Sequence, residues 1–350
     1  MNLGEDSVFH PPVAALPPAP TGWTFFCLER ELHRGPLACA YLDRRLVAFR
    51  AVSGRIGILE ARCRHLGADL ARGRVVDECL ECPYHQWQYG VDGRCENVPQ
   101  LRHIPPFARQ RSYPVAVRNG LVFMWNGSQA LYPLPFFDGL DPEDSVCAGP
   151  LIIDLDCPWY IVGANSFDSQ HLYSVHERVL QEPPQIRAPG PFTLESHTVA
   201  KIDGRGWYDR FVRSTAGAVS AMTATNWSGS LIFVRVKLKR ATTYGMVSLR
   251  PLGEQRVLTH VFAFLKRSES VLLEKTWDRL RTAVRLYLIG QFLRDDAARL
   301  GGIRPGAVNL IEADQDLARY FRWLARTANG RPSEAEKGFL EPTHCEGVQR

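Results

Sequence analysis

The sequence predicts an α+β protein in two parts, a small all-β domain followed by a larger antiparallel sheet that carries long helices. Three observations lead to this prediction. Short β-rich runs broken by glycines occupy residues 23–125, and longer alternating apolar runs occupy residues 151–265. Helical periodicity follows over residues 270–300 and 309–328. Residues 129–150 between the parts are rich in proline and glycine, which is typical of a linker.

The individual runs divide the chain into domains at 21–128 and 151–330. The β-rich runs of the first part are Leu46–Arg50, Arg55–Glu60, Val115–Val117 and Leu121–Trp125. The runs that predict the larger sheet are Leu151–Asp156, Trp207–Val212, Ser220–Trp227, Leu231–Leu238, Gly245–Leu249 and Val257–Leu265. The first long helix has an apolar stripe through Val271, Leu272, Trp277, Leu280, Val284, Leu288 and Phe292.

The two ends of the chain predict no packed structure and no membrane anchor. Residues 1–20 are acidic and proline-rich, unlike a signal peptide, so we expect a flexible N-terminus and a cytoplasmic protein; residues 331–350 are expected to be a tail. The most apolar helical window, Ala283–Leu293, is shorter than a membrane span and contains Arg285. The net charge of +5 is dispersed, which argues against nucleic acid binding.

A first group of metal-ligand residues lies in two short segments of the first domain. Cys63 and His65 stand in one segment, and Cys82 and His85 stand in the other, with sixteen residues between His65 and Cys82. Two thiolates and two imidazoles can hold either one zinc ion or a [2Fe–2S] cluster in which two histidines bind one iron. Each segment mixes Cys with His, whereas zinc fingers usually pair like with like. The mixed order favours the cluster and leaves zinc as the alternative.

A second group follows the linker, with Asn165, Asp168, His171 and His176 in twelve residues. Two histidines and one carboxylate make the facial triad that leaves open positions on Fe(II). Histidines five residues apart point about 140° away from each other on an ideal helix. They can bind one ion only if the helix ends or loosens between them. Asp168 precedes His171 by three residues, so its carboxylate is expected to orient the imidazole rather than bind metal.

Both groups resemble the motifs of Rieske non-haem iron oxygenases. The pattern Cys-x-His-Leu-Gly-Ala-x-Leu, followed by Cys-Pro-Tyr-His-x-Trp-x-Tyr and Asp-Gly-x-Cys, is similar to the Rieske cluster motif. Asn-x-x-Asp-x-x-His-x-x-x-x-His is similar to the motif of the mononuclear iron site. The resemblance implies a Rieske domain followed by a helix-grip catalytic domain, with Asn165 and Asp168 in catalytic roles.

The resemblance also implies a third iron ligand, an acidic residue on a late helix with a proline about nine positions further on. Asp296 and Pro305 have this spacing, so Asp296 is our choice. Asp295 is the neighbouring alternative. The other acidic candidates are Glu312, Asp314 and Asp316, of which the aspartates are also explained as first-turn acids of the last helix.

As a whole, the resemblance implies the oxygenase component of a Rieske-type monooxygenase, closer to single-component-type hydroxylases, demethylases and arylamine N-oxygenases than to two-subunit ring dioxygenases. Electrons from the [2Fe–2S] cluster would pass through Asp168 to Fe(II), across an interface of a homotrimer, to oxidise a small aromatic or alicyclic substrate with O₂. No GxGxxG segment follows a strand, so a separate reductase is expected, with or without a ferredoxin. The alternative is an electron-transfer Rieske protein without oxygenase activity.

Overall fold

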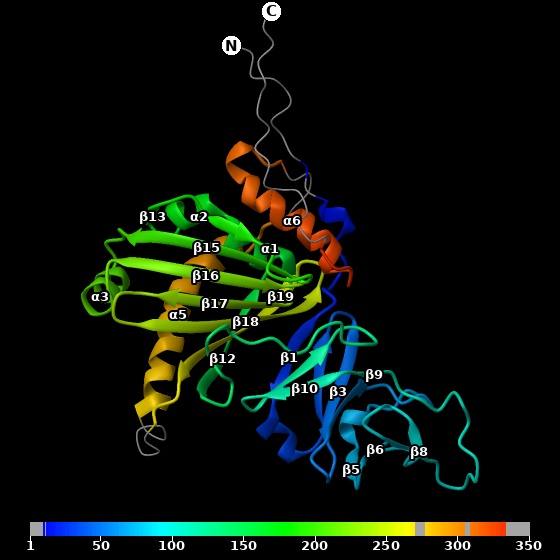
Figure 1. Cartoon of the computed structure of the whole chain (residues 1–350). Coiled ribbons are helices and arrows are strands. Elements are labelled where there is room, and N and C mark those ends of the chain that lie inside the picture. The colour runs from blue at the N-terminus through cyan, green and yellow to red at the C-terminus, as the bar shows by residue number, and fades with distance from the viewer. Residues whose placement is uncertain (1–9, 11, 270–276, 305–308, 334–350) are drawn as a thin grey trace, which may run out of the picture.

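A computed structural model describes residue 10 and residues 12–269, 277–304 and 309–333 of the chain. It contains a β-rich N-terminal part and a larger antiparallel sheet with helices (Figure 1). This arrangement confirms the predicted α+β class. None of the helices within the described ranges is long and apolar enough to cross a membrane.

The N-terminal part is built from three small antiparallel sheets. The first has the order β1-β11-β10, formed by Trp23–Leu28, Leu121–Trp125 and Val115–Arg118. The second has the order β2-β3-β4-β9, formed by Leu37–Tyr41, Arg44–Arg50, Ile56–Glu60 and Ser112–Tyr113. The third has the order β5-β6-β7-β8, formed by Arg74–Val76, Cys79–Glu81, Gln88–Tyr89 and Cys95–Asn97. The segment with Cys82 and His85 connects the central strands β6 and β7 of the third sheet, and the segment with Cys63 and His65 lies between β4 and β5 in the chain.

The second part is one eight-stranded antiparallel sheet. Its path is β12-β19-β18-β17-β16-β15-β13, and β14 also pairs with β15. The strands are β12 (Ser145–Leu155), β13 (Arg178–Leu180), β14 (Gln185–Arg187), β15 (Thr193–Ile202), β16 (Val219–Trp227), β17 (Leu231–Lys237), β18 (Thr242–Gly253) and β19 (Arg256–Lys266). Neighbouring strands follow one another in sequence from β15 to β19, as in a meander.

Helices lie against this sheet and at its edge (Figure 1). The α-helices are α1 (Trp159–Ala164), α2 (Ser169–Ser174), α3 (Trp207–Thr215), α5 (Arg279–Leu300) and α6 (Gln315–Thr327). The short 3-10 helices are η2 (Val13–Ala15), η3 (Glu29–Arg34), η4 (Leu70–Arg72), η5 (Asn165–Phe167) and η7 (Glu312–Asp314). The longest helix, α5, crosses behind the sheet and continues beyond its edge (Figure 1).

The two parts are joined by buried hydrogen bonds as well as by apolar packing. The Arg250 guanidinium on β18 donates to the carbonyl oxygens of Phe25 and Phe26 on β1, at 2.8 and 2.6 Å. The Thr24 hydroxyl donates to the carbonyl of Leu249 at 2.7 Å. Side chains of β1, β11 and the larger sheet share one hydrophobic cluster. The N-terminal part is therefore held against β18 of the larger sheet.

One sequence prediction is wrong. Residues 207–212 form helix α3 rather than a strand, because Trp207 and Phe211, and likewise Tyr208 and Val212, recur at the four-residue helical spacing. Strand β12 starts at Ser145, inside the range 129–150 predicted as a linker, and Gly149-Pro150 lies at a register shift within this strand. In the predicted helical range 270–300, Trp277, Leu280 and Val284 are 54%, 54% and 46% exposed, because the start of α5 projects past the sheet (Figure 1).

Two residues of the proline-rich N-terminal stretch, Ala15 and Pro17, accept hydrogen bonds from the second part of the chain. The indole of Trp159 donates to the carbonyl of Pro17 at 3.2 Å, and the Asn329 side chain donates to that of Ala15 at 3.0 Å. Prolines lack N–H donors, but their carbonyl groups still accept hydrogen bonds. Residues 1–9, the start of the predicted helix at Ser270, Pro305 and most of the tail 331–350 lie outside the described residues. The predicted domain boundaries stay predictions.

Two candidate metal centres

The segments around Cys63 and Cys82 fold into two matching loops. In each loop the cysteine carbonyl accepts from the amide four residues later, Gly67 at 2.8 Å and Gln86 at 3.1 Å. In each, the cysteine amide donates to the carbonyl five residues later, at 2.9 and 2.8 Å. Gly67 and Gln86 both have a left-handed backbone, with φ of 74° and 59°. The equal turns present one cysteine and one histidine apiece, although His65 follows its cysteine by two residues and His85 follows its cysteine by three.

The loops face each other with their cysteines inside and their histidines outside. Cys63 and Cys82 are 3% and 2% exposed, whereas His65 is exposed and His85 is half-buried. The two imidazole rings lie with centroids 4.5 Å apart. Burial raises the pKa of the Cys82 thiol, although the backbone amides of Tyr84 and His85 donate hydrogen bonds to its sulfur and act in the opposite direction. Such amides are suited to a sulfur that carries negative charge.

Aromatic side chains enclose the same loops. The ring of His65 stacks on Trp87 at a centroid distance of 4.7 Å and an angle of 4°. The Tyr89 hydroxyl lies 3.2 Å from the Cys63 sulfur and is placed to donate to it. Tyr89 itself is fully buried. The surroundings therefore provide hydrogen-bond donors to the sulfurs and shield them from water.

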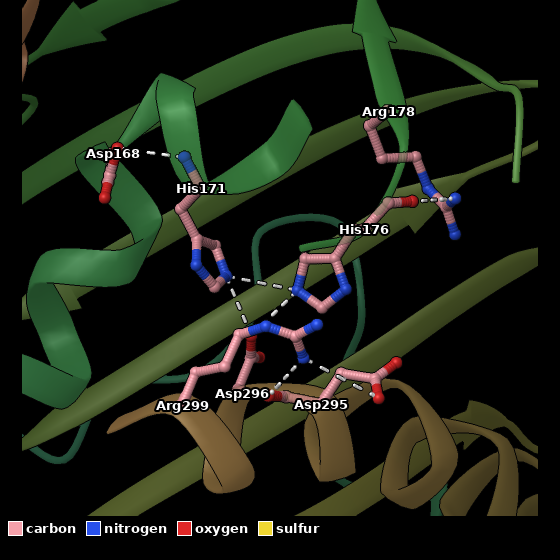
Figure 2. Close-up of polar contacts among 7 residues, drawn as sticks. All are labelled: Asp168, His171, His176, Arg178, Asp295, Asp296 and Arg299. Carbon is pink, nitrogen blue, oxygen red and sulfur yellow. Dashed lines mark hydrogen bonds and ion pairs between the residues drawn. The ribbon is translucent and has the colours of Figure 1, made fainter. Parts of the chain in front are cut away.

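The second centre is a triangle of three ligand atoms around the C-terminal end of α2 (Figure 2). His171 Nε2 and His176 Nε2 are 3.1 Å apart, and each lies 2.8 Å from Asp296 Oδ1. Two imidazole nitrogens and one carboxylate oxygen this close together can bind one metal ion. Three acceptor atoms pointing at one another repel unless a cation or protons lie between them, so the donor set fits a metal ion.

The local fold resolves the five-residue spacing of the histidines. Helix α2 ends at Ser174, and the chain turns at Glu177, whose φ is 51°. His176 therefore lies in the turn after the helix, as the spacing requires. Its ring stacks on Phe292 of α5, with centroids 3.8 Å apart and an angle of 11°. The ring position is thus set by α5 as well as by its own segment.

Asp296 belongs to the last turns of α5 and is 8% exposed. Burial raises the pKa of its carboxyl group, but the hydrogen bonds from His171 and His176 outweigh this effect and leave the pKa below its ordinary value. The alternative ligands lie elsewhere. The Asp295 side chain is 61% exposed and points away from the histidines (Figure 2). Asp314 accepts a hydrogen bond from Gln170 at 2.6 Å, and Glu312 and Asp316 are not in the triangle.

Asp168 acts on the backbone in this structure. Its Oδ1 accepts from the amide N–H of His171 at 3.0 Å, so Asp168 is the N-cap of α2 (Figure 2). We expected a contact with the imidazole ring from the sequence instead. Asn165 ends α1 and lines the cavity beside the triangle. The spacing alone could not distinguish a ring contact from a helix cap, because both place the carboxylate three residues before the histidine.

Comparison with protein families identifies the first centre. The family model described as "Rieske [2Fe-2S] domain" matches residues 22–113, which contain both loops. Residues 22–113 are a Rieske [2Fe–2S] domain. This confirms the resemblance stated for the first part of the chain. In the described residues, only His171, His176 and Asp296 bring three ligand atoms within 4.8 Å of one another. The Rieske-domain ligands are spread more widely, as a centre with two irons requires and a single zinc ion does not.

Relatives extend the similarity beyond the Rieske domain. A "Probable 3-ketosteroid-9-alpha-monooxygenase, oxygenase component" of Rhodococcus rhodochrous is 37% identical, over 59% of this chain and 50% of the relative. "Aminopyrrolnitrin oxygenase PrnD" of Pseudomonas fluorescens is 32% identical, over 44% of this chain and 45% of the relative. The chain thus spans half or less of the length of these curated relatives.

A solved structure shows that the two-part fold is shared. The structure titled "Pseudomonas putida CBB5 NdmB" superposes with a TM-score of 0.66, at 18% identity, over 88% of this chain and 90% of that one. This likeness concerns the fold. It covers the Rieske domain and the larger sheet together, so the sheet and its helices are also an established architecture.

Sequence reasoning missed the residues that hold the triangle and the cavity next to it. Arg178, which is 7% exposed, donates to the carbonyl of His176 at 2.6 Å and to Asp209 at 2.7 Å. It joins α3 to the segment of His176. A cavity of about 430 Å³ lies between the sheet and α5 and reaches His171, His176 and Asp296. No spacing in the sequence could have shown these contacts, which join elements that lie far apart in the chain.

Proposed function

We propose that this chain is the oxygenase component of a Rieske-type monooxygenase. The observation that carries the proposal is the triangle of His171, His176 and Asp296, which opens onto an apolar cavity in a chain that also contains a Rieske domain. A pure electron carrier needs no second ligand set and no cavity. The likeness to named oxygenases supports the same reading.

In the proposed enzyme, Cys63, His65, Cys82 and His85 hold the [2Fe–2S] cluster, and His171, His176 and Asp296 hold Fe(II). When bound, the iron would activate O₂ with electrons that the cluster supplies. The protein contributes the rest. Phe292 and Arg178 orient His176, the cap of Asp168 holds α2 in place, and the apolar wall excludes water from the reacting end of the substrate.

The substrate is proposed to be a small aromatic or alicyclic molecule. The cavity volume of about 430 Å³ is in the range of sites for such molecules. Its walls are mainly aliphatic, with Val234 and Val236 of β17 on one side and Leu288 and Ile289 of α5 on the other. The relatives' names include a ketosteroid monooxygenase and an aminopyrrolnitrin oxygenase, so hydroxylation, N-oxygenation and demethylation are all retained.

The proposal includes a separate reductase, with or without a ferredoxin, a homotrimer and a cytoplasmic location. The elements that carry the two centres are β5–β8 and α2. They lie at opposite ends of the folded molecule (Figure 1). This separation supports transfer between neighbouring subunits, with Asp168 between the centres. Asp168 Oδ1 is engaged by the His171 amide, which leaves its second carboxylate oxygen for a partner. The trimer rests otherwise on the family resemblance, and the location rests on the sequence of the N-terminal stretch.

The test is iron and acid-labile sulfide analysis of wild type, Asp296→Ala and the matched control Asp295→Ala. Wild type and the control should contain about three irons per chain, and Asp296→Ala about two, with sulfide unchanged in all three. An Asp296→Ala protein that keeps the third iron contradicts the ligand assignment. A wild type that contains only the cluster iron, after anaerobic loading with Fe(II), supports the electron-carrier alternative instead.

A further inference from the structure

Arg285 lies on the same face of α5 as Asp296, at the other end of the cavity. Both residues line the cavity, and eleven residues separate them. Eleven residues make about 3.06 turns of an α-helix, so the two side chains differ by only about 20° around the axis. They lie about 16.5 Å apart along it. The helix therefore brings one ligand of the triangle and one guanidinium to the same apolar space.

Apolar residues fill the helix face between these two positions. Leu288, Ile289, Phe292 and Leu293 line the cavity from α5, and Val234 and Val247 line it from the sheet. A molecule that reaches from the triangle to Arg285 must therefore be elongated and mostly apolar. Its two ends meet different chemistry: a metal-ligand set at one end, and a cation with hydrogen-bond donors at the other.

The charge of Arg285 is not compensated by the described residues. Its Nε is buried without a hydrogen-bond partner, and its Nη1 makes one long contact, 3.5 Å, to the carbonyl of Arg281. No ion pair joins it to a carboxylate within the described ranges. The other arginines near the cavity differ. Arg178 is paired with Asp209 at 2.7 Å, and Arg281 with Asp278 at 3.3 Å.

A half-buried guanidinium in an apolar wall is costly unless an anion or an acceptor pairs with it. Burial, followed by the charge of Arg281, lowers the pKa of Arg285, which reflects the same unpaired charge. A carboxylate fits best, because the guanidinium fork binds two carboxylate oxygens with parallel hydrogen bonds. An alcohol or ester oxygen would occupy one donor and leave the charge unpaired.

We propose that Arg285 is a specificity-determining residue that binds the carboxylate of an elongated, apolar acid, holding the opposite end of that molecule at His171, His176 and Asp296. The inference rests on the proposed function only in stating which end of the acid is oxidised. The oxidised carbon is then far from the carboxylate, at a distance comparable to the three helical turns between Arg285 and Asp296. Arg285 is the charged residue of the otherwise apolar window 283–293. Binding of a substrate carboxylate accounts for a charge at this position.

Binding of a matched pair of fluorescent probes, 1-pyrenebutyric acid and its methyl ester, tests the proposal on the purified full chain without turnover. Wild type should bind the acid at least ten-fold more tightly than the ester. Arg285→Met should lose this preference through weaker binding of the acid, with little change for the ester. Arg285→Lys should keep a smaller preference, because an ammonium is a point charge.

Arg281→Met is the matched control, since Arg281 lies one turn away, already has Asp278 as a partner and does not line the cavity. It should keep the full preference for the acid. Equal affinities for acid and ester in wild type, no binding of either, or a preference that survives in Arg285→Met would overturn the proposal. Iron content separates this failure from that of the proposed function, because Arg285→Met should retain the third iron whatever the probes show.

Discussion

His176 Nε2 and Asp296 Oδ1 lie 2.8 Å apart although 120 residues separate them in the sequence. The contact joins the turn after α2 to the end of α5, on the two sides of one apolar cavity. It therefore couples the position of a long helix to the geometry of the triangle. Any change that moves α5 relative to α2 should be detected first as weaker metal binding at this site.

The cluster assignment predicts different results for two cysteines in the same small sheet. Cys82→Ser should abolish acid-labile sulfide and the visible absorption of the cluster, because serine is a poor ligand for this kind of iron. Cys79→Ser is the control: Cys79 is a free, partly exposed thiol at the start of β6. Absorbance and sulfide analysis after purification under anaerobic conditions check both variants. Retention of the cluster in Cys82→Ser would contradict the assignment.

Tyr89→Phe should lower the reduction potential of the cluster. The variant removes the hydroxyl 3.2 Å from the Cys63 sulfur, and a hydrogen bond to a cluster sulfur stabilises the reduced state. A hydrogen bond of about 0.5–1.5 kcal/mol corresponds to about 20–60 mV for one electron. Redox titration measures the shift. Tyr113→Phe, which removes a hydroxyl bonded to Arg44, should leave the potential unchanged.

Substitutions of Asp168 separate its cap from an electron-transfer role. Asp168→Ala should lower the free energy of unfolding of α2 and its surroundings by about 0.5–2 kcal/mol, because the His171 amide loses its acceptor. Asp168→Asn keeps an oxygen acceptor and should keep most of the stability. Urea denaturation measures both variants.

If Asp168 also lies between the centres of neighbouring subunits, Asp168→Asn should still lose turnover. Reduced-cluster reoxidation in the presence of O₂ should become at least ten-fold slower, while iron and sulfide contents stay at wild-type levels. Wild-type reoxidation rates in a stable Asp168→Asn protein would limit Asp168 to the helix cap. The two readouts thus test the two roles independently.

The buried His260 predicts a pH dependence of stability. Burial, with the Arg250 charge, lowers the pKa of His260 to about 3, whereas the pKa of a histidine in the unfolded chain is about 6.5. The folded pKa is depressed, so the unfolded state binds the proton first as the pH falls. This contribution to stability is complete above about pH 6.5 and is lost between that value and about pH 3.

Between pH 7 and pH 5, wild type should therefore lose about 2 kcal/mol of unfolding free energy more than His260→Gln, which cannot titrate. Urea titrations at the two pH values give the difference. The other titratable groups contribute equally to both proteins. Equal pH dependences would therefore show that folding does not lower the pKa of His260 and that it becomes protonated in the folded state between pH 7 and pH 5.

The motifs of both centres were predictable because they are local. Cys63 and His65 are two residues apart, and the backbone hydrogen bonds that shape each loop join residues only four or five positions apart. The strands β11 and β17 matched their predicted runs closely for a similar reason, since a short run of apolar, β-branched and aromatic residues is a property of neighbouring positions. Helix α3 was mistaken because its apolar residues come in adjacent pairs, which both periodicities tolerate.

The sequence by itself determined the two-part organisation, the two cluster loops and the histidine pair, since each depends on turns, spacings and periodicities of neighbouring residues. Only the tertiary structure decided which acid meets the histidines, which arginines are paired and where the cavity lies. Those properties depend on how α5 lies across the sheet, and that placement results from the summed packing of side chains from many elements rather than from any single spacing.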